Sequence, residues 1–478
     1  MAKNITSRES DYSQWYLDVI KAAELADYSP VRGCMVIRPT GYAIWEEIQA
    51  KMDKAFKETG HVNAYFPALI PEEFLRREAK HVEGFAPECA MVTHAGGSEL
   101  EEPYALRPTS ETIFGHMYNK WITSWRDLPM LINQWANVFR WEKRTRLFLR
   151  TSEFLWQEGH TAHATADEAM EETRRMLEVY RHIMHEEMAL PVIDGIKSEG
   201  ERFPGADETF TVEAMMSDGK ALQSGTSHFL GQRFAKAFDI KFQDKDESTQ
   251  YCWTTSWGVS TRLVGAIIMT HSDNDGLVLP PRIATRKVVL LPIGKGEEAQ
   301  NKALEECQNL ATELRKVLGF TAVHVDQDFD ARPADRFFAH LQKGVPLRLE
   351  LGEKDLAAGT VRAVCRDNGE KIDIPFAEMA TRVPQLLDQI QSRLYEKAKA
   401  FRDANIVDVT SYEELQKVLS EGKWGRCYFA GSVEDEKRLK EENQATVRCF
   451  PLATIDQRGT CIMTGKADAR LALIARSY

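Results

Sequence analysis

The sequence predicts a large α+β domain built on an antiparallel sheet, followed by an α/β domain and a small α+β domain at the C-terminus. In the first part of the 478-residue chain, long amphipathic helices are separated by runs of short strands, whereas strands and helices alternate after about residue 285. Nine of the ten tryptophans lie before residue 260, so the first part also differs in composition. We expect domains over residues 1–285, 286–400 and 401–478.

The first domain is expected to contain two long helices and several strands. Apolar residues recur at helical spacing over Tyr42–Thr59 and Ala166–Leu190, which predicts amphipathic helices. Short alternating or β-rich stretches predict strands at Val138–Trp141, Phe148–Trp156, Phe210–Ala214 and Ser256–Val259. This grouping is typical of an antiparallel α+β sheet and not of repeated βαβ units.

The pattern changes after Leu277–Lys287 (LVLPPRIATRK), whose two prolines and basic residues mark the exit from the first domain. The next elements are predicted as a strand at Lys287–Pro292, a helix at Glu297–Leu318, a strand at Ala322–Asp326, a helix at Arg332–Lys343 and strands at Pro346–Leu351 and Thr360–Arg366. The last stretch, Phe401–Tyr478, opens with a helix through Ala404 and carries the charge run Glu434–Asn443. We interpret it as a third domain.

Composition limits the class of protein. The net charge of −11 argues against a protein that coats nucleic acid non-specifically, although a local basic patch could still dock one. The eight cysteines are scattered and form no CxxC pair, so a disulfide framework is not expected. The polar N-terminus and the short apolar runs, far below the ~20 residues of a membrane span, predict a cytoplasmic protein with no membrane segment.

The block Ala105–Glu111 (ALRPTSE) holds the first candidate site residues. Thr109 and Glu111 are two positions apart, so on an extended segment they share a face, where a hydroxyl and a carboxylate suit an ammonium group. The alternative is a helix N-cap at Thr109 or Ser110.

The block Phe139–His163 is predicted to be a hairpin with a basic loop at its tip. Arg140 and Glu142 would share one face of the first strand. On the second strand, alternate positions are occupied by Arg150, Ser152, Phe154 and Trp156, and the loop contains Lys143, Arg144 and Arg146. Guanidinium groups match phosphate oxygens bidentately, so this hairpin suits a polyphosphate. A solvated hairpin with cross-strand ion pairs is the alternative.

Two further blocks each combine small residues with a side chain that is a candidate for ligand contact. In Gln223–Phe234 (QSGTSHFLGQRF) the small residues would let a ligand approach the backbone, and His228 adds a polar group, although a lone histidine is more often structural. In Gly258–Asp273 a strand leads into an apolar helix, and Arg262 at the junction is placed for phosphate. A core helix with a solvated arginine is the alternative. The sequence contains neither a Walker A pattern nor GxGxxG.

In this order the four blocks resemble the class II aminoacyl-tRNA synthetases and, within them, the prolyl-tRNA synthetases. Phe66–Leu75 (FPALIPEEFL), the hairpin block and the Gly258–Asp273 block are similar to the first, second and third motifs of that class. The ALRPTSE and QSGTSHFLG blocks and the terminal ARSY are similar to features of the prolyl enzymes. The resemblance covers nearly the whole chain. It implies a class II catalytic domain, an anticodon-binding domain and a C-terminal zinc-binding-like domain.

The resemblance implies a reaction and roles for individual residues. Proline and ATP, with Mg²⁺, would form prolyl-adenylate, and the prolyl group would pass to the 3′ end of tRNA(Pro). Arg140 would bridge the proline carboxylate and the α-phosphate, and Arg262 would hold phosphates. The remaining proline-binding residues would be Thr109, Glu111, Trp156, Phe203 and His228, and the remaining ATP-binding residues Glu142, Arg150, Thr151, Gln223 and Thr226. The enzyme would be a homodimer.

The segment Lys343–Val361 resembles the anticodon-binding signature of this family. Arg348, Glu350 and Lys354 would lie against the anticodon, and a solvated charged strand face is the alternative. Leu341 stands where the family usually has glutamate, which removes one expected contact.

The resemblance also predicts what this chain lacks. About 95 residues separate His163 from Gly258, too few for the editing insertion of many bacterial relatives, so the chain looks like the archaeal/eukaryotic type. Editing of mischarged alanine would then fall to a separate deacylase. A four-cysteine zinc site would fall on Ala430, Asp435, Cys461 and Thr464, of which only one is cysteine, so no structural zinc is expected unless Cys427 and Cys449 take part in a different geometry. The final Tyr478 matches the terminal tyrosine that reaches toward the active site, with a frayed terminus as the alternative.

Two other functions remain open. A non-catalytic regulator related to the synthetases would be expected to lose one phosphate-binding arginine, but Arg140 and Arg262 are both present. A threonyl or seryl synthetase would be expected to have a different pocket from the one that the ALRPTSE and QSGTSHFLG blocks imply.

Overall fold

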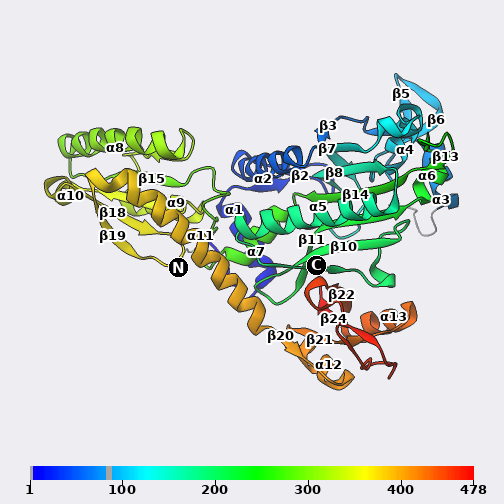
Figure 1. Cartoon of the computed structure of the whole chain (residues 1–478). Coiled ribbons are helices and arrows are strands. Elements are labelled where there is room, and N and C mark those ends of the chain that lie inside the picture. The colour runs from blue at the N-terminus through cyan, green and yellow to red at the C-terminus, as the bar shows by residue number, and fades with distance from the viewer. Residues whose placement is uncertain (1–3, 82–88) are drawn as a thin grey trace.

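The computed structural model describes residues 4–81 and 89–478, so residues 1–3 of the expected first domain and residues 82–88 lie outside it. The molecule is organised around one large sheet, with a smaller five-stranded sheet at one end (Figure 1). The large sheet has the strand order β20-β21-β24-β22-β9-β10-β11-β14-β8-β7-β3, and β23 pairs with β24. In the part of the chain described here, no helix is both long and apolar enough to cross a membrane.

The first 285 residues supply seven strands of the large sheet and most of its covering helices. The helices are α1 (Tyr12–Ala22), α2 (Pro39–Glu58), α3 (Glu72–His81), α4 (Glu111–Trp121), α5 (Ala166–Glu186), α6 (Arg233–Phe238) and α7 (Arg262–His271). The sheet strands are β3 (Val62–Asn63), β7 (Met130–Phe139), β8 (Glu153–His163), β9 (Val192–Ile196), β10 (Glu208–Met215), β11 (Ala221–Gly231) and β14 (Trp253–Ser260). Smaller sheets contain β1 (Ala26–Tyr28), β2 (Met35–Ile37), β4 (Leu69–Pro71), β5 (Met91–Ala95), β6 (Ser98–Leu106), β12 (Lys241–Gln243) and β13 (Thr249–Tyr251).

The predicted helices of this region are confirmed. Helix α5 begins with a capping box, in which Thr165 and Glu168 satisfy each other's backbone N–H groups. Its apolar face, which includes Met176 and Tyr180, is buried across β10, β11 and β14. The α+β class with an antiparallel sheet is therefore correct.

The predicted hairpin is present, but the strand boundaries in it are wrong. Strand β7 ends at Phe139, which pairs with Glu153 at the start of β8. Arg140, Glu142 and Arg150 therefore lie in the connecting loop and not on alternating strand faces. The loop folds inward, because Leu147–Leu149 are buried in succession and Phe148 has a φ of 60°, which an extended strand does not allow.

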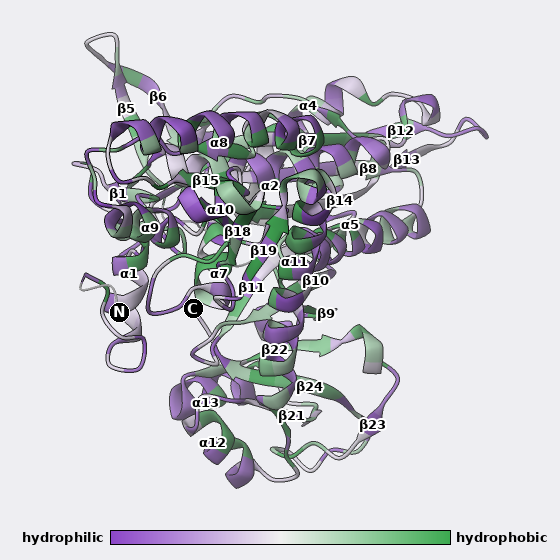
Figure 2. Ribbon diagram, turned by 90° about the vertical axis from the view of Figure 1, so that its left-hand side faces the viewer, coloured by the Kyte–Doolittle hydropathy of each residue, from purple (hydrophilic) through white to green (hydrophobic). Residues whose placement is uncertain are grey.

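The second region is the expected α/β domain. Its sheet has the order β16-β15-β17-β18-β19, parallel across the first three strands and antiparallel across the last three. The elements are β15 (Val288–Pro292), α8 (Glu297–Leu318), β16 (Val323–Val325), α9 (Pro333–Gln342), β17 (Leu347–Leu351), α10 (Glu353–Ala358), β18 (Thr360–Cys365), β19 (Lys371–Pro375) and α11 (Met379–Ala404). The long helix α11 passes through residue 400, so the helix expected at Phe401 is its last turn. In Figure 2 the outer faces of α5 and α8 are mainly purple, and the strands beneath are mainly green.

The C-terminal region extends the large sheet. Its elements are β20 (Ile406–Asp408), α12 (Tyr412–Ser420), β21 (Trp424–Phe429), α13 (Val433–Asn443), β22 (Ala445–Pro451), β23 (Arg458–Gly459) and β24 (Ala469–Arg476). Strand β22 pairs with β9 through Phe450–Ile196 and Pro451–Gly195. A Cβ at Gly195 would lie 2.6 Å from the Cβ of Cys449, so glycine lets the two strands approach. The charge run is helix α13, and three strands of this region continue the order beyond β22.

Candidate active site

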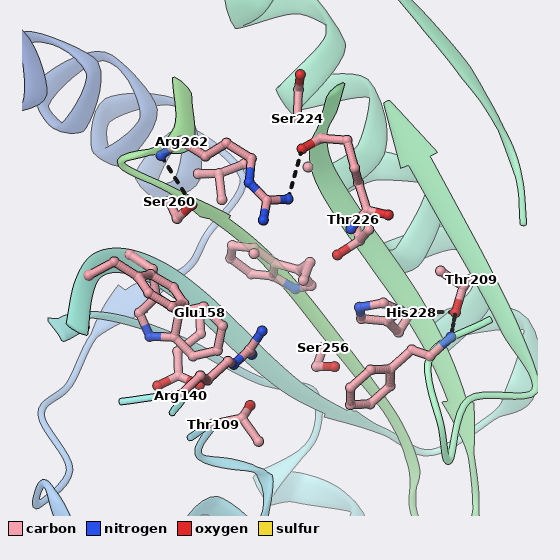
Figure 3. Close-up of a pocket in the computed structure, with 18 of the residues that line it drawn as sticks. Thr109, Arg140, Glu158, Thr209, Ser224, Thr226, His228, Ser256, Ser260 and Arg262 are labelled. Carbon is pink, nitrogen blue, oxygen red and sulfur yellow. Dashed lines mark hydrogen bonds between the residues drawn. The ribbon is translucent and has the colours of Figure 1, made fainter. Parts of the chain in front are cut away.

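A cavity of about 350 Å³ lies on the face of the large sheet opposite α5. The alternation of β11 places its residues on the two sides. Ser227 points toward α5, where its Oγ donates to the carbonyl oxygen of Thr173 at 2.7 Å. Its neighbours Thr226 and His228 point into the cavity (Figure 3).

The cavity brings together all twelve site residues predicted in the first domain. These are Thr109, Glu111, Arg140, Glu142, Arg150, Thr151, Trp156, Phe203, Gln223, Thr226, His228 and Arg262. They come from the loop before α4 and the first residue of α4, the β7–β8 loop, β8, the segment after η2 (Glu199–Glu201), β11 and the start of α7. Segments that are up to about 150 residues apart in sequence therefore form one site.

One side of the cavity is acidic. Thr109 donates through Oγ1 to the Glu111 carboxylate, and both side chains are at least nine-tenths buried. Glu111 is the first residue of α4 and Ser110 is its N-cap, so the block both starts a helix and lines the cavity. The extended geometry expected for Thr109 and Glu111 is not present, but the helix start brings the two groups together all the same.

A buried pair beneath this side was not among the predicted residues. Glu158 accepts hydrogen bonds from Ser110 at 2.5 Å and Gln134 at 2.8 Å, and lies 2.9 Å from Nε2 of His160. Burial raises the pKa of Glu158, but the hydrogen bonds and the His160 charge outweigh it and hold the pKa below its usual value. Burial lowers the pKa of His160, but Glu158 outweighs that effect and raises it. The sequence signal was the period-2 spacing of Trp156, Glu158 and His160 along β8.

Two arginines reach into the cavity from opposite sides (Figure 3). Nε of Arg262 donates to the carbonyl of Leu149 at 3.2 Å, and Nη1 to that of Gln223 at 3.4 Å. Burial and the positive charges of Arg150 and Arg140 lower the pKa of Arg262 to about 10. The charge of Arg262 is thus balanced by the dipoles of two carbonyls and is repelled by Arg140 and Arg150. This excess of positive charge favours binding of an anion beside Arg262.

Arg140 is held by one carbonyl and two rings. Its Nε donates to Pro108 at 3.0 Å, and its guanidinium lies 5.3 Å from the Trp156 ring and 5.6 Å from the Phe154 ring. Arg150 lies 3.6 Å from Glu142 and is half exposed at the rim. This end of the cavity is rich in cations, as the hairpin block predicted.

The remaining wall is aromatic. Phe203 lies 4.6 Å, centroid to centroid, from the His228 ring. Thr209 Oγ1 joins the two, since it accepts from the Phe203 N–H at 3.1 Å and lies 3.0 Å from Nδ1 of His228. Burial, with the charge of His160 nearby, lowers the pKa of His228 to about 3, so this ring is neutral at pH 7.

The predicted anticodon residues lie in the second domain, outside the cavity. Nε of Arg348 on β17 contacts Oε1 of Glu350 at 2.8 Å, and its guanidinium lies 4.9 Å from the Phe337 ring. Lys354 is exposed on α10. Leu341 lies on α9.

The last residue of the chain is held by hydrogen bonds, and one expected zinc position has another role. The Tyr478 hydroxyl donates to Asp218 at 2.5 Å, and its backbone N–H donates to Ala221 at 3.1 Å. Asp435, at one expected zinc position, instead caps α13 by accepting from the Ser432 N–H. Over residues 4–81 and 89–478, no group of three His, Cys, Asp or Glu side chains could hold a metal ion.

The chain is similar to known enzymes along its whole length. A curated proline–tRNA ligase from Chloroherpeton thalassium is 55% identical over 100% of both chains. The chain belongs to the proline–tRNA ligases. A second member of this family, from Roseiflexus castenholzii, is 54% identical over 100% of this chain and 99% of its own.

Family models and a solved structure agree with the membership. The class II core domain of the G, H, P, S and T synthetases matches residues 92–271, an anticodon-binding domain matches 287–386, and the prolyl-tRNA synthetase C-terminal domain matches 412–478. The crystal structure of prolyl-tRNA synthetase from Cryptosporidium parvum, complexed with halofuginone and AMPPNP, has a TM-score of 0.94 and 39% identity over 99% of both chains. As a proline–tRNA ligase, the chain is an enzyme that joins proline to tRNA. Residues 164–257, all described, form α5 to β13 and the first part of β14, which leaves no separate domain between the second and third motifs.

Proposed function

We propose that the cavity binds L-proline and ATP side by side and catalyses formation of prolyl-adenylate. The observation that carries this proposal is that one cavity contains both the buried carboxylate of Glu111 and the guanidinium groups of Arg140 and Arg262. Proline needs a carboxylate for its imino cation, and ATP needs cations for its phosphates. A regulator needs no such pair of phosphate-binding arginines.

At the acidic side, Thr109 and Glu111 would hold the imino group of proline. Trp156, Phe203 and His228 would enclose its ring. The low pKa of His228 supports this role, because a neutral ring does not repel the imino cation at pH 7.

Arg140, whose Nε is bonded to the carbonyl of Pro108 beside Thr109, would contact both the proline carboxylate and the α-phosphate. Arg262 would hold the outer phosphates. The other ATP contacts would come from Glu142, Arg150, Thr151, Gln223 and Thr226, which line the same cavity.

The residues present suit Mg²⁺ that arrives with ATP. Magnesium usually keeps several waters and binds through substrate phosphates and one or two carboxylates, and the cavity offers Glu142 and Glu201. When bound, the ion would neutralise phosphate charge.

The reaction then needs positioning more than proton transfer. A proline carboxylate oxygen attacks the α-phosphorus, the bond to the β-phosphate oxygen breaks, and pyrophosphate leaves. A ribose hydroxyl at the 3′ end of tRNA next attacks the prolyl carbonyl, loses its proton, and AMP leaves. Fixed guanidinium groups stabilise the charge that develops on the α-phosphate without reorganisation.

Outside the cavity, Arg348, Glu350 and Lys354 would contact the anticodon of tRNA(Pro).

The enzyme would act in the cytoplasm as a homodimer. Exposed apolar side chains support the dimer, such as Tyr65, which is 72% exposed, and Val62, which is 61% exposed. Alanine is smaller than proline, so the pocket can reject it only through the contacts that alanine does not make, which are worth only about 1–3 kcal/mol per methylene. A separate deacylase would therefore edit tRNA that is mischarged with alanine.

ATP–pyrophosphate exchange with proline, threonine, serine, cysteine and alanine tests the proposal. We expect exchange to be fastest with proline and to be lost in Arg140→Ala with the fold intact. Exchange with none of the five would favour a regulator, and a preference for another amino acid would reassign the substrate.

A further inference from the structure

The segment after η2 forms one wall of the cavity and is anchored from the other end of the chain. Together with Glu201, the last residue of η2, it contributes Arg202, Phe203 and Pro204 to the cavity lining. Ser198, at the N-cap of η2, does not direct its hydroxyl to the η2 backbone.

Glu436 on α13 accepts hydrogen bonds from both sides of the η2 N-terminus. Its Oε2 accepts from the Ser198 hydroxyl at 2.7 Å, and its Oε1 accepts from the Gly200 N–H at 3.2 Å. Glu436 is 8% exposed and Ser198 is 4% exposed, so both contacts are shielded from water. A Cβ at Gly200 would lie 2.8 Å from Glu436 Oε2, which indicates how closely the carboxylate approaches the backbone. Charge-assisted hydrogen bonds in such surroundings are among the stronger ones.

A second contact ties the same wall to the sheet. Arg448 on β22 lies 2.9 Å from Glu213 on β10 and 3.8 Å from Glu201 in η2. Lys197, just before η2, lies 2.7 Å from Glu213. Two cations and two carboxylates thus balance at the base of the wall, and one of the cations belongs to the C-terminal region.

We propose that Glu436 is a positioning residue for the proline pocket, because it fixes the wall that carries Phe203. This inference rests on the proposed function and extends it to specificity. A tightly held Phe203 keeps contact with the proline ring, and smaller alanine loses that contact. Such contacts allow discrimination of about 10–200-fold between proline and alanine, so any added mobility of this wall reduces the discrimination directly.

The test compares Glu436→Ala with Glu441→Ala, an exposed glutamate on the same helix. Loss of Glu436 should raise KM for proline about tenfold, the size expected for one buried hydrogen bond to a charged group, and should leave KM for ATP within about twofold. The ratio of kcat/KM for proline over alanine should fall several-fold. Glu436→Gln keeps one carbonyl acceptor and should recover part of the loss, whereas Glu441→Ala should match the wild type.

A second variant and a second measurement cover the case in which Glu436→Ala does not fold. Ser198→Ala removes one donor and leaves α13 intact, and it should change KM for proline in the same direction by a smaller factor. Hydrogen exchange of the peptide that contains Gly200 should accelerate about tenfold in Glu436→Ala and by a smaller factor in Glu436→Gln, but should not change in Glu441→Ala.

The outcomes separate the two proposals. If the wild type shows no proline-dependent exchange, the proposed function is wrong and the specificity role falls with it. If the wild type is active but the Glu436 and Glu441 variants have the same KM for proline, only the positioning role is refuted. Equal losses for proline and ATP would also refute it, because they would indicate general damage.

Discussion

Replacing Arg262 with alanine tests the assignment of the cationic side of the cavity. Among the described residues, the guanidinium donates to two carbonyls alone, at 3.2 and 3.4 Å, and burial together with the neighbouring arginines lowers its pKa to about 10. Its removal leaves no buried carboxylate without a partner, so the melting temperature should hardly change. A charge-assisted contact to phosphate contributes about 1.5–3 kcal/mol, which corresponds to a loss of about 10–150-fold in kcat/KM for ATP.

Arg262→Lys and Arg181→Ala complete this experiment. Lysine keeps the charge but not the planar fork, so it should restore only part of the activity. Arg181 pairs with Glu178 on α5, away from the cavity, and its alanine variant should behave as the wild type. The measurement is ATP–pyrophosphate exchange at saturating proline. A change below threefold in Arg262→Ala, with the protein folded, would refute the phosphate role.

Three further results are expected. Lys354→Ala should weaken charging of tRNA and spare amino-acid activation, and equal losses in the two assays would contradict the division of labour between domains. Arg366, which directly follows β18, donates to both carboxylate oxygens of Asp273, just after α7, at 2.7 and 2.8 Å, so Arg366→Ala should lower the free energy of unfolding by about 1–3 kcal/mol in thermal unfolding. Arg362→Ala on β18, which removes an exposed ion pair with Asp373, should lower it by only about 0–1 kcal/mol. Burial lowers the pKa of His163 to about 4, below the ~6.5 of the unfolded chain. The free energy of unfolding should therefore be unaffected by this residue above pH ~6.5 and should fall by on the order of 2–3 kcal/mol as the pH drops to about 4. His163→Gln should flatten this dependence of stability on pH, and an unchanged dependence would exclude His163 as its source.

Local periodicity of apolar residues was sufficient to predict most helices and the fold class of each domain. Helix α8 lies at Glu297–Leu318, as predicted, because its apolar spacing is unbroken and Gly296 and Gly319 flank it. Helix α11 was mostly missed, and it contains Pro384, a residue that usually ends a helix.

The site was predicted by residue identity, but its geometry was not. The charged and aromatic alternation around Arg140 suggested a strand, whereas Phe148 turns the chain inward. Glu158 and His160 were overlooked because their role in the site depends on hydrogen-bond partners from other segments, including Ser110. Contacts of that range are not encoded in local patterns, and neither is the pairing of β22 with β9.

That pairing has a consequence for anyone who shortens the chain. A version ending at Ala404 would leave the backbone donors and acceptors along one border of β9 unpaired at Gly195 and Ile196. Such a border is a template for association with other molecules, so the shortened enzyme should be prone to self-association. The last 74 residues therefore cover an edge of the catalytic sheet, and they cannot be removed as an independent domain.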